Sequence, residues 1–222
     1  MISLEILVAE ILALFFLSRV LTISLSIVLQ LLHFHQKLIV FFIAIIFFPG
    51  TLIHELSHWL MAKLLLVRTG KVSLFPQLIG NSITMGSVII EKTDTIRSFM
   101  VGVAPLMTGI GIIFLTFYFL LPFINNLTNF EIALFIYCIF VVSNSMFSSA
   151  KDLEGGMIFI VFCFFFILFL FLFDQQLITQ VYHYLSLIPQ SALKSVTLFL
   201  SIPLVLDIII VCVLRLFIRI FR

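Results

Sequence analysis

Two histidines and a glutamate stand close together in an otherwise apolar part of the chain, in the order His54-Glu55-Leu56-Ser57-His58. On an α-helix, side chains four residues apart lie on one face, so His54 and His58 can direct imidazole nitrogens at one metal ion. Glu55 can take a proton from a water molecule without being a ligand. Two ligands on one helix turn, a base, and a third ligand from elsewhere are typical of zinc hydrolases. The spacing therefore predicts a Zn2+ site with His54 and His58 as ligands and Glu55 as the catalytic base.

The composition is that of a membrane protein. Apolar residues make up 63% of the 222 residues and charged residues only 10%, against about 25% charged in typical globular chains. Ionisable side chains are costly at membrane depth and usually mark a functional site there. The alternative is an interfacial helix whose polar residues face water. The net charge of +2 gives no indication of nucleic-acid binding, and we expect no nucleic-acid partner.

Apolar runs of about the length that crosses a bilayer occur six times. They cover approximately 6–32, 38–67, 98–122, 131–149, 157–173 and 195–215. Pro49-Gly50 should kink or break the second run, so that a new helical segment begins near Thr51. We expect an all-α polytopic membrane protein with about six transmembrane helices. It would form a single membrane-embedded domain over residues 1–222, with its core at about 38–156.

Residues 68–98 form a break in the apolar pattern. Segments starting at Val72 and Ile83 are rich in strand-forming residues, and Gly80-Asn81 is a turn signal between them. The pattern predicts a small β-hairpin or sheet between the second and third spans. Its free edge could accept an extended peptide by strand addition. A plain loop with no binding role is equally compatible with the sequence.

The basic residues indicate an orientation. With six spans, one side of the membrane receives nine of them and the other side two. The nine are Lys63, Arg68, Lys71, Lys92, Arg97, Lys151, Arg215, Arg219 and Arg222; the two are Lys37 and Lys194. The larger set marks the cytoplasmic side. We therefore expect a multi-pass protein of the cell membrane with both termini in the cytoplasm.

The third zinc ligand must come from the few remaining acidic residues. Asp152 follows the fourth run, at the end that shares the cytoplasmic side with the end of the motif helix, so we predict Asp152 as the ligand. Glu154 and Glu131 are the alternatives, although Glu131 lies near the opposite surface. Asp207, inside the last run, is plausible only as a polar contact.

These residues resemble the site-2 protease class of intramembrane zinc metalloproteases. That family pairs a membrane-embedded His-Glu-x-x-His with a later Asn-x-x-Pro-x-x-Pro-Leu-Asp-Gly motif. Here Asn144 stands eight residues before Asp152, and the stretch 103–109 is similar to the family's small-residue segment. Phe147 and Ala150 stand where the family has its prolines. The resemblance covers about 50–156 and describes a divergent, minimal member.

The resemblance implies hydrolysis of peptide bonds in or near transmembrane segments, with a membrane protein or peptide in the lipid bilayer as substrate. It also implies Asp152 as the third ligand, and Asn144 as a residue that positions substrate or stabilises the oxyanion. Two alternatives stay open. One is a different membrane zinc protease class, with a glutamate as third ligand. The other is a zinc-binding membrane protein without proteolytic activity, a pseudoprotease or a transporter. The sequence leaves the oligomeric state unknown.

Overall fold

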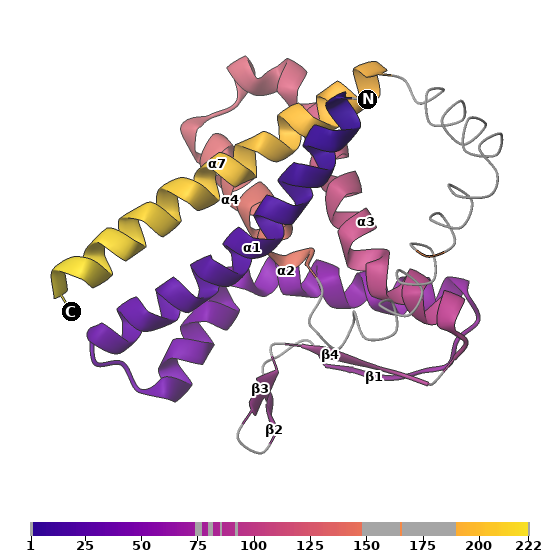
Figure 1. Ribbon diagram of the computed structural model, residues 1–222, viewed down its shortest axis with the longest axis horizontal. Coiled ribbons are helices and arrows are strands. Elements are labelled where there is room, and N and C mark those ends of the chain that lie inside the picture. The colour runs from indigo at the N-terminus through magenta and orange to yellow at the C-terminus, as the bar shows by residue number, and fades with distance from the viewer. Residues whose placement is uncertain are drawn as a thin grey trace.

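The computed structural model describes residues 2–73, 77–79, 82–84, 86–91, 93–147, 165 and 190–221. Long helices dominate these residues (Figure 1). In chain order the helices are α1 (Ile2–Leu31), α2 (Gln36–Leu64), α3 (Thr95–Leu120), a short 3-10 helix η1 (Leu121–Asn126), α4 (Asn129–Ser145) and α7 (Gln190–Phe221).

Four of these helices, α1, α2, α3 and α7, are long and apolar enough to cross a membrane. Helix α4 is apolar but has only 17 residues. At 1.5 Å per residue it measures about 26 Å, slightly less than a typical hydrocarbon core of about 30 Å. The described residues therefore support a polytopic helical membrane protein with four candidate spans rather than the full six. The expected span at 157–173 lies almost entirely outside the described residues.

Four short strands lie between α2 and α3. Strand β1 (Thr69–Ser73) pairs antiparallel with β4 (Ser87–Ile90), and β2 (Gln77–Ile79) pairs antiparallel with β3 (Ser82–Thr84). Figure 1 shows both strand pairs below α2 and outside the helices. The prediction of a small hairpin or sheet between the second and third spans is confirmed.

The sequence predicts a kink or a break at Pro49-Gly50. Helix α2 does not break there, so no separate helix starts near Thr51. The helix runs without interruption from Gln36 to Leu64. Proline leaves the carbonyl four residues earlier, that of Ile45, without its helical donor. At the next carbonyl, Tyr137 of α4 donates a hydrogen bond to Ile46 O at 2.7 Å. Helix α4 thus contacts α2 in the turn that contains Pro49.

Helices α1 and α7 pack along each other and run in the same direction. Leu14 shares one buried cluster with Leu200, and Leu21 shares another with Val211. The residue numbers rise together along the pair, and Figure 1 shows the chain ends at opposite ends of it. If both helices cross the membrane, this packing does not fit the expectation that both termini lie in the cytoplasm.

The core lies where α1, α3, α4 and α7 meet. Phe117 of α3 stacks on Phe199 of α7, with ring centroids 4.6 Å apart, and Ile113 is buried beside them. Small residues bring α3 close to α4, because a Cβ added at Gly109 would lie 2.6 Å from Met146 Cβ. Gly111, two residues further along α3, has no neighbour within 4 Å. The packing holds the end of α4 against α2 and α3.

Candidate metal centre

The two motif histidines face each other on α2. Their Nε2 atoms lie 3.1 Å apart, and their ring planes are inclined at 84°. Each ring is fixed from behind by a main-chain carbonyl: Nδ1 of His54 lies 2.7 Å from Ser145 O, and Nδ1 of His58 lies 2.8 Å from Val101 O. Helices α4 and α3 thus orient the two rings on α2. The expected convergence of the two histidines is present.

The hydrogen bonds determine which ring nitrogens carry hydrogen. A carbonyl oxygen can only accept, so both Nδ1 atoms must be the donors. In a neutral imidazole the lone pair is then on Nε2, and both lone pairs are directed into the same small space. At 3.1 Å they repel unless a proton or a cation lies between them. Metal-binding histidines typically donate their other N–H to a carbonyl or carboxylate in this way.

The spacing fits zinc. With Zn–N bonds of about 2.0–2.1 Å, two nitrogens 3.1 Å apart subtend roughly 100° at the metal, close to the tetrahedral angle. His58 is only 4% exposed, and Glu55 is 8% exposed. The donor set and its surroundings therefore suit a zinc ion held away from bulk water.

A glycine brings α4 close enough to hold His54. A Cβ added at Gly50 would lie 2.5 Å from Val141 O and 2.7 Å from Ser145 Cβ, closer than real side chains pack. Only glycine fits between these helices at this point. The same approach places the Ser145 carbonyl one helix turn further along α2, at His54. Gly50 is therefore a structural requirement of the histidine site.

Glu55 lies against the strand region. A Cβ on Gly86, the residue before β4, would lie 2.9 Å from Glu55 Cγ and 3.0 Å from its Oε1. The Glu55 side chain lies so close to the backbone at position 86 that only glycine fits there. The segment leading into β4 thus borders the proposed base. The sequence carried a signal for this contact, because a glycine in a strand-like stretch often marks a close approach.

The described residues do not supply a third ligand. No group of three His, Cys, Asp or Glu side chains within the described ranges could hold a metal ion. Asp152 and Glu154 lie outside those ranges. Glu131 is at the far end of α4, where its Oε2 accepts a hydrogen bond from the Thr128 N–H in a capping box. Fourteen residues of helix, about 21 Å, separate Glu131 from Ser145 beside His54, so Glu131 does not reach the histidines.

Asn144 is bonded to Asp207 rather than exposed toward the histidines. Its Nδ2 donates to Asp207 Oδ1 at 2.7 Å and to Phe140 O at 2.9 Å, which uses both amide hydrogens. Asp207 is completely buried, and neither its Oδ2 nor Asn144 Oδ1 has a hydrogen-bond partner among the described residues. Asp207 makes the polar contact that the sequence suggested for it. The partner was not predictable, because it is 63 residues away in the chain.

Comparisons with known proteins add no assignment. No family model, curated protein or solved structure matches this chain.

Proposed function

We propose that this protein is an intramembrane zinc metalloprotease that cleaves peptide bonds in or near transmembrane segments of membrane-protein substrates. The observation that carries the proposal is the pair of Nε2 atoms 3.1 Å apart, each on a ring whose Nδ1 faces a carbonyl. Glu55 at the position after His54 adds to it. So does the apolar setting, since four helices of the described residues, among them the motif helix α2, are long enough to cross a membrane.

The proposed ligands are His54, His58 and Asp152. A zinc ion held there would lower the pKa of a water molecule toward 7 and polarise the peptide carbonyl. Glu55 takes the proton from the attacking water and passes it to the leaving amine. Its burial beside Gly86 keeps bulk water away from the carboxylate. A helical substrate must partly unwind to react, because its peptide groups are engaged in its own hydrogen bonds.

Asn144 belongs to the proposal as a positioning residue. In the structure both its amide hydrogens are used by Asp207 and Phe140, so a hydrogen bond to an oxyanion would require it to release one of them. Its backbone neighbour Ser145 carries the carbonyl that orients His54. Asn144 thus fixes the end of α4 that holds the first ligand, and direct contact with substrate is not needed for this role.

The alternatives differ in the third ligand or in the chemistry. A protease class with a glutamate ligand would need Glu154 here, because the place of Glu131 at the far end of α4 disfavours that residue. A transporter or pseudoprotease would also use the two histidines. The burial of Glu55 next to them favours a catalytic site, since a carboxylate with no role is costly to bury.

The test compares wild-type protein with Glu55→Gln, using a transmembrane peptide that carries a helix-breaking residue and a matched peptide that does not. We expect wild-type protein to cleave the first peptide faster. Glu55→Gln should lose at least about 10²-fold in rate while keeping its zinc, because the amide cannot accept the proton. The control is Glu91→Gln, which removes an exposed carboxylate after β4. Undiminished cleavage by Glu55→Gln would contradict the proposal.

A further inference from the structure

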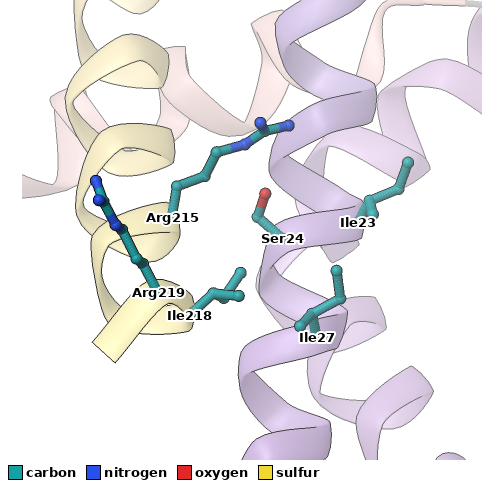
Figure 2. Close-up of a pocket in the computed structure, with 6 residues that line it drawn as sticks. All are labelled: Ile23, Ser24, Ile27, Arg215, Ile218 and Arg219. Carbon is teal, nitrogen blue, oxygen red and sulfur yellow. The ribbon is translucent and has the colours of Figure 1, made fainter. Parts of the chain in front are cut away.

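A second polar site lies between α1 and α7, near the ends of both helices. A cavity of about 460 Å³ is lined by Ile23, Ser24, Ile27, Arg215, Ile218 and Arg219. Figure 2 shows the Arg215 side chain extending from α7 toward α1, with the Ser24 hydroxyl close to the gap between the helices. We propose that this cavity binds the phosphate group of an anionic phospholipid.

No acidic side chain of the described residues balances the charge of the cavity. Within the described residues neither Arg215 nor Arg219 forms an ion pair. Helix α1 has no acidic residue after Glu10, and the only acid of α7, Asp207, is completely buried against Asn144. Figure 2 shows Arg215 directed toward α1 and Arg219 directed to the other side of α7. The Arg215 guanidinium can hold phosphate oxygens with strong hydrogen bonds, and the long side chain of Arg219, one helix turn away on the same lining, adds positive charge. The electrostatics therefore favour an anion.

Ser24 independently indicates a ligand. Four serines are buried among the described residues: Ser18, Ser24, Ser57 and Ser143. Three of them donate to a carbonyl of the preceding helix turn. Ser24, 3% exposed, has no hydrogen-bond partner in the described parts of the chain. Ser24 lines the cavity of the two arginines, so its hydroxyl is available to a ligand there. A phosphate oxygen would accept its hydrogen bond.

The apolar residues that line the cavity favour a lipid over a soluble phosphate. The other lining residues are isoleucines, of which Ile23 is 60% exposed. Leu216 and Ile220, which follow the two arginines in the chain, are 60% and 67% exposed. Acyl chains can cover these side chains while the headgroup sits at the arginines. Basic pockets between transmembrane helices are suited to anionic headgroups. A free phosphate would gain nothing from this apolar surface.

The experiment reconstitutes the full-length protein in phosphatidylcholine bilayers that contain a minor fraction of phosphatidylglycerol. The protein is then extracted, and its retained lipids are counted by native mass spectrometry. We expect wild-type protein to retain phosphatidylglycerol in preference to phosphatidylcholine. The double variant Arg215→Ala/Arg219→Ala should lower this retention on the order of tenfold. Ser24→Ala should lower it several-fold through one lost hydrogen bond.

The matched control is Lys63→Ala/Arg68→Ala, which removes the same charge from exposed positions after the motif and should retain lipid like the wild type. Equal phosphatidylglycerol retention by the Arg215/Arg219 double variant and the wild type would overturn the proposal, as would equal retention of the two lipids. Complete displacement of phosphatidylglycerol by excess inorganic phosphate would identify a free-phosphate site and overturn the lipid assignment.

Discussion

The side-chain amide of Asn144 joins α4 to α7 through a 2.7 Å hydrogen bond to the buried carboxyl of Asp207. Asn144 directly precedes Ser145, whose carbonyl holds the Nδ1–H of His54. A polar contact deep in the helix bundle is thus one residue away from the contact that orients a proposed metal ligand. The last helix is thereby connected to the site, although its sequence carries no catalytic signature.

The Asn144–Asp207 pair should contribute to stability. Replacing Asp207 by Leu would leave the Asn144 amide without its acceptor, and we expect a loss of about 1–3 kcal/mol in the free energy of unfolding. Asp207→Asn keeps an acceptor oxygen and should lose much less. Thermal unfolding of both variants in detergent checks the expectation. A Leu variant as stable as the wild type would show that the pair is energetically neutral.

The close approach of α2 and α4 requires a glycine at position 50. Gly50→Ala would place a Cβ 2.5 Å from Val141 O, so the helices must separate, at a cost of about 1–3 kcal/mol. The Ser145 carbonyl would move away from His54, and zinc binding should weaken. The control is Gly111→Ala, where nothing lies within 4 Å of the new Cβ. There we expect a stabilisation of about 0.5–1 kcal/mol from helix propensity. Similar unfolding temperatures for the two variants would contradict this account.

Zinc binding should respond in opposite ways to the loss of Asp152 and the loss of Glu131. Asp152→Ala should lower zinc affinity by at least about tenfold, because a catalytic zinc needs three protein ligands. Glu131→Ala should keep its zinc and lose only the capping contact with Thr128, worth about 1 kcal/mol. Zinc titration of both variants, with Glu154→Ala beside them, measures the difference. Zinc kept in Asp152→Ala but lost in Glu154→Ala would reassign the third ligand.

The parallel packing of α1 and α7 bears on the orientation of the chain. If both helices cross the bilayer, the amino and carboxyl termini lie on opposite sides. Reporter tags at the two ends should therefore respond oppositely to a protease added outside sealed cells. The same response from both tags would support the arrangement that the basic residues indicate. It would also mean that α1 and α7 do not both cross in the direction their packing shows.

The local parts of the site could be predicted from the sequence, and the long-range contacts could not. The spacing of His54 and His58 predicts two rings on one helix face, and their Nε2 atoms are 3.1 Å apart. The strand pattern at 68–98 predicts the small sheet that is present. The hydrogen bond from Tyr137 to Ile46 O, beside Pro49, joins residues 91 positions apart in the chain, so the pattern around Pro49 alone could not predict it. The carbonyls that accept from the two histidine rings are also distant in the chain: Ser145 is 91 residues from His54, and Val101 is 43 residues from His58.

The most direct test of the central claim is the zinc content of the purified protein, measured by elemental analysis. We expect about one zinc ion per chain in the wild type, and none in His54→Ala or His58→Ala. The matched control is His33→Ala/His35→Ala, which removes two exposed histidines from the link between α1 and α2 and should keep the full zinc content. If His58→Ala bound as much zinc as the wild type, or if the wild type bound none after reconstitution with metal, the proposed metal centre would be wrong.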